Sequence, residues 1–235
     1  MGTVINAIAI VVASILGVMF KKGLPERLQK SVMFVLGLGL SVLAIGWFLR
    51  DFLVIEEAAL ISSGDLLIIV SLVLGTLIGE HMDIDKGISG FAENIEKKYK
   101  LPPLAKGFVA GTLIFCVGAM AILGSIADGL HGDVSILLVK SALDFITAMM
   151  LAAVLGIGVL FSAFSVLVYQ GSITILASFS GMFLTDDMVR SLSMVGNIIL
   201  VAMGLNFMGL TKTKVANMLP ALLIPIVYFV IVGLF

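Results

Sequence analysis

Long apolar stretches alternate with short polar segments along the whole chain. A helix needs about 20 apolar residues to cross the hydrocarbon core of a membrane. The stretch 134–184 has only Lys140 and Asp144 as charged residues and is too long for one crossing, and Gly156 and Gly158 interrupt it near its middle. The pattern therefore predicts an all-α bundle of about eight transmembrane helices, or seven if this stretch crosses once. The eight expected spans are residues 3–20, 31–50, 65–81, 104–127, 134–155, 158–183, 188–209 and 216–235.

The largest polar segment, residues 81–103, has a helical pattern of its own. Its apolar residues recur three and four positions apart, which places them on one face of a helix. We expect a short amphipathic helix near 84–98 that lies at the membrane interface and ends before Pro102-Pro103. Asp83 stands directly before it, in a position to cap its first turn. The apolar face consists of Ile84, Ile88, Phe91 and Ile95.

The charges of the polar segments predict the orientation of the chain. Lysines gather in the segments 21–30, 81–103 and 210–215, whereas the segments between them are mainly acidic. Eight spans place all three lysine-bearing segments on one side of the membrane, and the positive-inside rule then puts both chain ends outside. Seven spans would move the last of these segments to the opposite side. Because no basic segment precedes the first span, we expect a retained first helix and not a cleaved signal peptide.

Composition excludes several classes of protein. Hydrophobic residues make up 60% of the sequence and charged residues 12%, and the mean hydropathy is +1.22. A soluble globule could not cover so much apolar surface, so we expect residues 1–235 to form a single integral membrane domain. The one cysteine, Cys116, excludes an internal disulfide and a cysteine zinc cluster. A net charge of −1 gives no basic footprint for nucleic acid.

Small residues recur four positions apart in several predicted spans. Such ladders let neighbouring helix backbones come close, which is how helices associate inside a membrane. We expect them to pack helices within the chain, and association with a second copy of the chain through these faces stays an open alternative. The ladders are Ala9, Ala13 and Gly17; Ser71, Gly75 and Gly79; Gly107 and Gly111; and Ala148, Ala152 and Gly156.

Charged and polar side chains within the predicted spans are the main candidates for function. Asp144 lies at the middle of its span, and Lys140, four residues earlier, shares one helix face with it. A charge at the bilayer centre costs ~2.5–3.5 kcal/mol on insertion scales, so the two residues form either a structural ion pair or part of a solute path. Gln170 and Asn197 lie near the middle of the next two spans, where hydrogen bonds between helices are the alternative to a path. The candidate path residues are Asp144, Lys140, Gln170, Asn197, Cys116, Ser141 and Asp128.

Two acidic clusters at the ends of predicted spans have the chemistry of metal ligands. Residues 128–133 hold two aspartates and a histidine, and a turn rich in glycine and aspartate explains them more simply than a cation site. Glu80, His81 and Asp83 do not share one helical face. We therefore expect no metal and no other cofactor. The sequence has no P-loop, HExxH, GxSxG or dinucleotide-binding motif and no nucleophile–base set, so we expect no enzyme.

Six groups of residues resemble a known family. They are Phe115-Cys116-Val117-Gly118-Ala119-Met120; Lys140-Ser141 with Asp144-Phe145; Gly158-Val159 through Tyr169-Gln170-Gly171; Gly196-Asn197 through Asn206; Gly2-Thr3 with Asn6; and Ile78-Gly79-Glu80 with Ile84-Asp85. In these positions the sequence resembles the bacterial YdfK/YqgA family, and the resemblance covers essentially the whole chain. It implies a multi-pass protein of the bacterial inner membrane from a family without an assigned function. It supplies no substrate, cofactor or catalytic residue.

The sequence predicts a small transporter or channel for an ion or a small polar solute. The alternative is a non-catalytic membrane scaffold or sensor subunit, held together by its small-residue ladders. A path requires Asp144, Gln170 and Asn197 to line one water-accessible cavity, whereas purely structural contacts would leave these side chains paired and dry. The partners we expect are membrane lipid and the small solute or ion.

Overall fold

The computed structural model describes residues 1–21, 25–56, 59–62, 64–99, 103–116, 119–179 and 185–232. The chain divides into two compact units, and each unit combines two separate stretches of sequence. Each unit is described by itself. The division does not decide whether residues 1–235 form one membrane domain, and that expectation stays a prediction.

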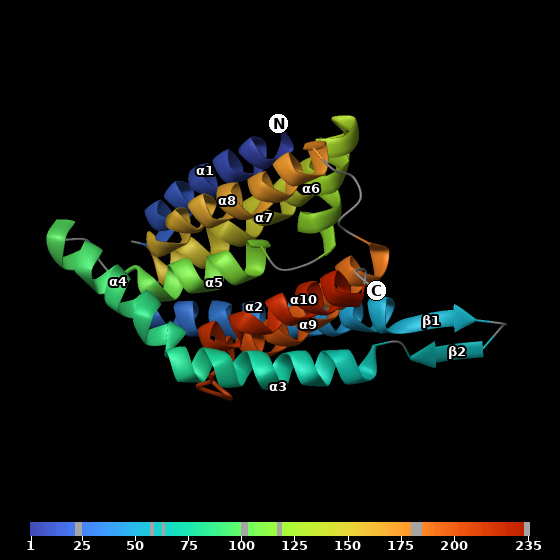
Figure 1. The fold of residues 1–235 in the computed structure, drawn as a ribbon. Coiled ribbons are helices and arrows are strands. Elements are labelled where there is room, and N and C mark those ends of the chain that lie inside the picture. Colours follow the sequence, from blue (N-terminus) through green and yellow to red (C-terminus); the bar gives the residue numbers. More distant parts are fainter. Residues whose placement is uncertain are drawn as a thin grey trace. The chain divides into compact units, whose positions relative to one another are not determined.

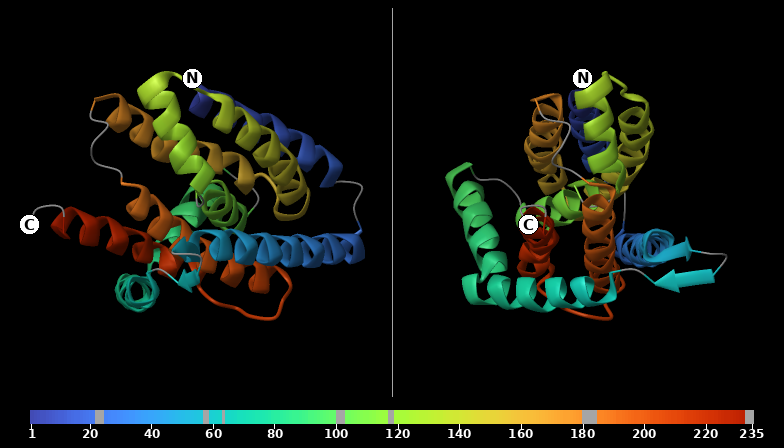
Figure 2. Two further views of the ribbon diagram at one scale, coloured as in Figure 1. Left: turned by 90° about the vertical axis from the view of Figure 1, so that its right-hand side faces the viewer. Right: turned by 45° about the vertical axis from the view of Figure 1, so that its right-hand side comes forward.

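The first unit comprises Met1–Met33 and Ile88–Phe183. Three of its helices, α1, α7 and α8, lie side by side, as Figure 1 shows and as the two views of Figure 2 confirm. The helices α5 and α6 pack mainly against α8. The bounds are α1 (Gly2–Lys21), α5 (Ala105–Cys116), α6 (Ala119–His131), α7 (Ser135–Leu155) and α8 (Gly158–Phe179), and α4 (Ile84–Tyr99) contributes most of its length.

The second unit comprises Phe34–Gly87 and Leu184–Phe235. In it, α3 packs against the 3-10 helix η1, which continues directly into α10. Pro220 lies inside η1 and has no backbone N–H to donate to a regular α-helical ladder. The bounds are α2 (Glu26–Phe52), which begins in the first unit, β1 (Leu53–Glu56), β2 (Ala59–Ser62), α3 (Asp65–Met82), α9 (Asp186–Phe207), η1 (Val215–Leu222) and α10 (Leu223–Val232).

The prediction of seven to eight membrane spans is confirmed. Within the described residues, 7 segments are long and apolar enough to cross a membrane, and a bent pair of shorter helices makes 8 if it counts as one span. The stretch 134–184 does divide into two helices. Gly156 ends α7 with a φ of 86°, a backbone conformation that favours glycine, and its N–H donates to the carbonyl of Ala152.

The expectation of one continuous helix over 104–127 is wrong. The segment consists of α5 and α6, whose axes differ by 61°, and residues 117 and 118 between them lie outside the described part. The two helices approach different neighbours closely. A Cβ added at Gly107 in α5 would meet the backbone of Val159 at the start of α8, whereas one at Gly124 in α6 would meet Leu137 in α7. Hydropathy alone predicts one span because it does not register such separate contacts.

A short hairpin was not expected. The strands β1 and β2 pair antiparallel, with Leu53 opposite Ser62 and Glu56 opposite Ala59, and residues 57 and 58 lie outside the described part. Strands of 4 residues are too short to stand out in a reading that searches for apolar stretches of helix length. Apart from this hairpin, the regular structure of the described residues is helical, so the all-α class holds.

The helix α4 covers Ile84–Tyr99 and confirms the helix expected near 84–98. The side chains of Phe91 and Ile95, half of its expected apolar face, lie outside the described part. The expected cap is wrong. Asp83 ends α3 in a left-handed conformation, and its side chain pairs with Lys214 at 3.1 Å. Asn217 takes the capping role instead, because its Oδ1 accepts a hydrogen bond of 2.7 Å from the N–H of Asp85.

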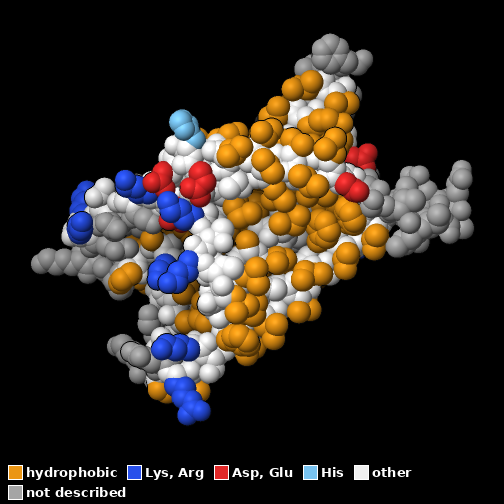
Figure 3. Space-filling view, turned by 90° about the horizontal axis from the view of Figure 1, so that it is seen from below, with side chains coloured by type: hydrophobic (Ala, Val, Ile, Leu, Met, Phe, Trp, Pro, Cys, Tyr) orange, Lys and Arg blue, Asp and Glu red, His pale blue; other side chains and the backbone are white. Residues whose placement is uncertain are grey.

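The outward side of α3 is apolar. Figure 3 shows a face on which hydrophobic side chains gather over this helix. The exposed residues include Leu66, Ile69, Val73 and Leu77, which recur three and four positions apart. On the opposite side, Gly75 and Gly79 are buried against η1. A helix with one face packed and one apolar face exposed suits a position between protein and lipid.

The orientation of the chain stays a prediction, and cysteine labelling checks it. In a Cys116→Ala background, we expect Asp187→Cys to react with an impermeant thiol reagent in intact cells. Lys30→Cys, Lys98→Cys and Thr213→Cys should react only after the cells are opened, because the positive-inside rule predicts that the lysine-bearing segments face the cytoplasm. Labelling of the variants at 98 and 213 but not at 187 in intact cells would reverse the proposed orientation.

Candidate functional site: a buried polar cluster

Four polar side chains from three helices meet inside the first unit. Asn6 lies on α1, Lys140 and Asp144 on α7, and Gln170 on α8. Asp144 Oδ2 accepts from Lys140 Nζ at 2.5 Å and from Asn6 Nδ2 at 2.9 Å. Asn6 Nδ2 also lies 3.4 Å from Gln170 Oε1. These residues form the polar cluster, which links α7 to α8 through α1.

Local sequence explains how the polar cluster assembles. Lys140 and Asp144 are four residues apart, so they lie on the same face of α7. The short side chain of Asn6 reaches them because α1 runs close to α7. Gly17 makes this approach possible, since a Cβ at that position would overlap the backbone carbonyl of Met149. Glycine and alanine residues on α1 therefore bring the Asn6 amide into position, although they take no part in its hydrogen bonds.

The polar cluster is closed to the surroundings of the first unit. Asn6 and Gln170 are 0% exposed, and Lys140 and Asp144 are each 6% exposed. Two charges removed from water are costly unless they are paired and hydrogen-bonded. The ion pair has no net charge when both members are ionised, and the Asn6 amide adds a second donor to the carboxylate. The geometry thus meets the main requirements of a buried ion pair.

Two amide atoms of the polar cluster have no partner among the described residues. They are Asn6 Oδ1, an acceptor, and Gln170 Nε2, a donor, and both are buried. An unsatisfied buried polar atom costs ~1–3 kcal/mol, so bundles that need only stability satisfy such atoms or replace them. The polar cluster therefore has one free donor and one free acceptor beside a buried ion pair. Unpartnered buried atoms also occur at Ser14, Asn197 and Asn217 among the described residues, and in the polar cluster two of them lie on side chains next to an ion pair.

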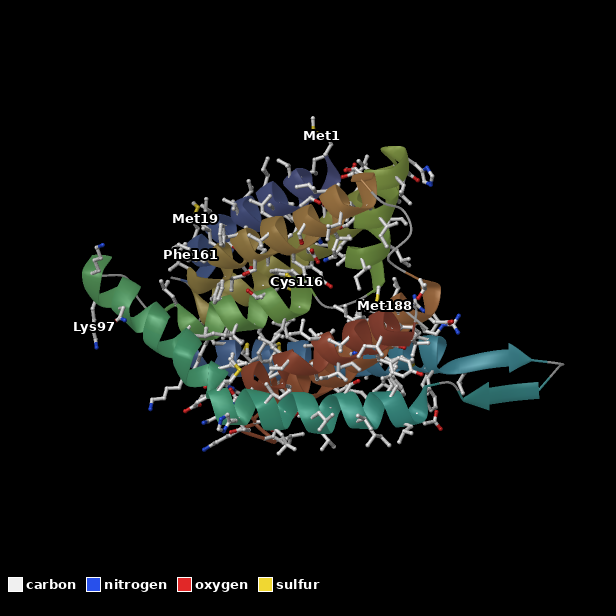
Figure 4. The ribbon with its side chains drawn as sticks, in the orientation of Figure 1. Met1, Met19, Lys97, Cys116, Phe161 and Met188 are labelled. Carbon is white, nitrogen blue, oxygen red and sulfur yellow. The ribbon has the colours of Figure 1, made fainter. Side chains whose placement is uncertain are left out.

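The structure brings together three of the predicted path residues, namely Asp144, Lys140 and Gln170. Ser141 lies beside them on α7, but its hydroxyl donates to the carbonyl of Leu137 at 2.6 Å. Cys116 is buried at the end of α5, where Figure 4 labels it, and its thiol lies near Lys140 and Asp144. These two residues border the polar cluster without a hydrogen bond to it among the described contacts.

Asp128 lies at the end of α6 and holds the start of α1. Its Oδ2 accepts from the backbone N–H of Gly2 at 2.9 Å and from the ammonium group of Met1 at 2.9 Å. A carboxylate at a helix N-terminus satisfies free N–H groups and complements the helix dipole. This contact gives Asp128 a structural role, and its place on a path stays a prediction.

Asn197 belongs to the second unit, in the middle of α9. Its Nδ2 donates to Ser193 Oγ at 3.3 Å, and Ser193 in turn donates to Asp51 Oδ2 at 2.5 Å. The Oδ1 atom of Asn197 is buried and has no partner in the part of the chain that the structure describes. A cavity that Asn197 shares with Asp144 and Gln170 therefore stays a prediction.

Asn6 is the member of the polar cluster that reasoning from residue chemistry missed. A single asparagine near the beginning of an apolar stretch resembles the start of a helix and not a mid-membrane group. The available signal was its presence among the runs that carry the family resemblance. Thr3, one turn away on α1, lies 3.5 Å from Thr174 on α8 and extends the polar contact between these two helices.

Within the described residues, no three or more metal-ligating side chains are arranged so that they could hold a metal ion, and this includes the acidic clusters at the span ends. The first of them forms a turn. Gly132 adopts a positive φ of 67°, and Asp133 accepts a hydrogen bond of 2.9 Å from the N–H of Ser135 at the start of α7. Hydrogen bonds from Ser135, through its side chain and then its backbone, lower the pKa of Asp133. In the other cluster, the hydrogen bond and charge of Asp83 raise the pKa of Lys214.

Comparison with known proteins agrees with the membrane architecture. The pattern of the family described as "Protein of unknown function (DUF554)" matches residues 1–230. The chain belongs to the DUF554 family. It is 34% identical over 234 residues to "Uncharacterized membrane protein YdfK" of Bacillus subtilis (strain 168). The aligned region covers 98% of this chain and 96% of the relative. It is also 34% identical over 230 residues to "Uncharacterized protein YqgA" of Escherichia coli (strain K12), covering 95% and 93%.

No solved structure matches the chain. The family, its membrane relative and the apolar helices together identify a multi-span membrane protein of the DUF554 family. The resemblance to the YdfK/YqgA family is thereby confirmed. The family description assigns no activity, so any function has to be argued from the polar cluster itself.

Proposed function

We propose that this protein is a transporter or channel of the bacterial inner membrane that passes an ion or a small polar solute. The polar cluster of Asn6, Lys140, Asp144 and Gln170 is its binding site within the spans. Ionisable residues inside a membrane are costly and usually belong to a solute or proton path. The bacterial relatives favour a cell membrane as the location.

One observation carries this proposal. The free acceptor Asn6 Oδ1 and the free donor Gln170 Nε2 lie next to the buried Lys140–Asp144 pair. A scaffold gains nothing from keeping these atoms unsatisfied, whereas a site that exchanges its ligand needs spare hydrogen-bonding capacity. The polar cluster lacks a nucleophile–base set, so we also propose that the protein is not an enzyme.

A membrane scaffold or sensor subunit is the second candidate. The direct bond between Lys140 and Asp144 favours it, because a purely structural pair would have this geometry. So do the close helix contacts through glycine, such as that of Gly17 with α7. In that case water would not enter the polar cluster of the folded protein.

Water access discriminates between the two candidates. In a Cys116→Ala background, Gln170→Cys and Ser141→Cys place single thiols inside and beside the polar cluster. We expect both to react with a small water-soluble thiol reagent in membranes, because a path must admit water to its binding site. A cysteine at Ala163, which is buried on α8, serves as a control for a dry helix face. Complete protection of all three thiols in folded protein would support the scaffold.

Flux through liposomes tests the transport itself. We expect the purified protein to pass at least one of a panel of small ions and polar solutes, and Asp144→Asn to lower this flux by ~10-fold or more. Ser125→Ala is the matched control, since this buried serine of α6 bonds only to the carbonyl of Ala121 in the described contacts. Flux equal to that of empty liposomes for every probe would contradict the proposal.

A further inference from the structure

The polar cluster offers hydrogen-bonding groups of two opposite kinds. The ammonium of Lys140 and the unpartnered Nε2 of Gln170 are donors. The carboxylate of Asp144 and the unpartnered Oδ1 of Asn6 are acceptors. Because the four side chains already touch one another, a small molecule that enters between them would meet both kinds at once.

Charge selects among the molecules that could bind there. A lone cation on Asp144 would leave the Lys140 ammonium without its partner, and a lone anion on Lys140 would leave the Asp144 carboxylate alone. An unpaired buried charge is strongly unfavourable. A neutral molecule without charges would leave the ion pair closed and reach only the two amide atoms. A molecule that carries both charges can pair with Lys140 and Asp144 together.

Building on the transport function proposed above, we propose that the polar cluster binds a small zwitterion, such as glycine or another small amino acid. The ammonium of the ligand donates to Asp144 and to Asn6 Oδ1. Its carboxylate accepts from Lys140 and from Gln170 Nε2. The bond between Lys140 and Asp144 opens as the two new ion pairs form, no proton changes place, and the site carries no net charge before or after binding.

This assignment uses both unpartnered amide atoms and both charges. Lys140 and Asp144 pair with each other at 2.5 Å, so neither charge is left alone in low dielectric before a ligand binds.

Three probes of similar size test the proposal on the purified full-length protein in detergent: glycine, methylamine and acetate. We expect glycine to bind in a calorimetric titration and to raise the melting temperature. Methylamine and acetate, each tested alone, should bind at least ~10-fold more weakly, because each satisfies only half of the site. Gln170→Met keeps the length of the side chain and removes the donor, and should weaken glycine binding by ~10-fold. Ser125→Ala, outside the polar cluster, should bind glycine as the wild type does.

Two results would overturn the zwitterion assignment. One is acetate or methylamine binding as tightly as glycine, which indicates a single-ion site. The other is glycine binding that survives both Gln170→Met and the double change Lys140→Met with Asp144→Leu. The double variant removes both charges together and keeps the test usable if Gln170→Met does not fold.

Liposome flux separates this proposal from the one on which it rests. Asp144-dependent flux of an ion, without glycine binding, would leave the transport function standing and remove the zwitterion. Glycine binding by the polar cluster without flux of any probe would remove transport and keep the ligand class, as expected of a sensor. Absence of both binding and flux in folded protein would remove both proposals.

Discussion

An Asp144→Leu variant that retains Lys140 should lose ~3–5 kcal/mol of its free energy of unfolding. The carboxylate accepts from both Lys140 and Asn6, so its removal leaves a buried ammonium without its partner and the Asn6 amide without its shorter hydrogen bond. Lys140→Met should cost a similar amount for the converse reason. Unfolding of the purified variants in mixed detergent with increasing sodium dodecyl sulfate measures the change.

The double variant Lys140→Met with Asp144→Leu should recover most of this stability, because no charge remains unpaired. Under the proposed function it should fold and still lack flux. Stability as low as the sum of the two single changes would mean that the residues do not act as a pair. A double variant that folds normally and keeps full flux would remove Asp144 from the binding site.

Gly79→Leu should lower the free energy of unfolding by ~3 kcal/mol or more and reduce the yield of folded protein. A Cβ at Gly79 would overlap the backbone carbonyl of Asn217, and one at Gly75 would overlap the backbone of Ala221. Backbone atoms of η1 cannot move aside as the end of a flexible side chain can, so α3 and η1 would have to separate. Gly75→Leu should therefore have an effect of similar size.

Gly39→Leu and Gly46→Leu are matched controls for this prediction. Both glycines lie in the interior of α2, and a Cβ at either position meets nothing within 4 Å. Leucine has the higher helix propensity, so these variants should fold as well as the wild type or better. Folded yield by size-exclusion chromatography compares all four. Normal yield of both Gly75→Leu and Gly79→Leu would mean that this face of α3 meets lipid and not η1.

Hydropathy predicted the helices well because the membrane imposes one requirement on every span. Each needs about 20 apolar residues and must satisfy its backbone internally, so both length and class can be read from sequence. This requirement is local, so prediction from hydropathy fails where tertiary contacts determine the geometry of a helix. The bend between α5 and α6 and the 3-10 geometry of η1 leave no mark on the mean hydropathy of those segments.

The candidate site was predictable in its charges and less so in its partners. Lys140 and Asp144 lie on one helix with a spacing that already implies contact. The neighbours of Asp144 depend on which helices approach it. The small-residue ladders indicate which face of a helix packs closely, but they do not indicate which other helix packs against that face. Gly17 could have packed against any span, and the Asn6–Asp144 bond follows only once α1 is placed beside α7.

The interleaving of the two units has a consequence for biosynthesis. Residues 1–33 belong with 88–183, and residues 34–87 belong with 184–235, so the ribosome finishes neither unit before most of the chain exists. Asn6 and Asp144 are 138 residues apart, and at about 5–20 residues per second the first helix waits ~7–30 s for its partner. During that time its amide has no carboxylate to bind. The early helices therefore depend on the insertion machinery or on lipid contacts until translation supplies their partners, and no cut between two consecutive spans yields two fragments that each contain a whole unit.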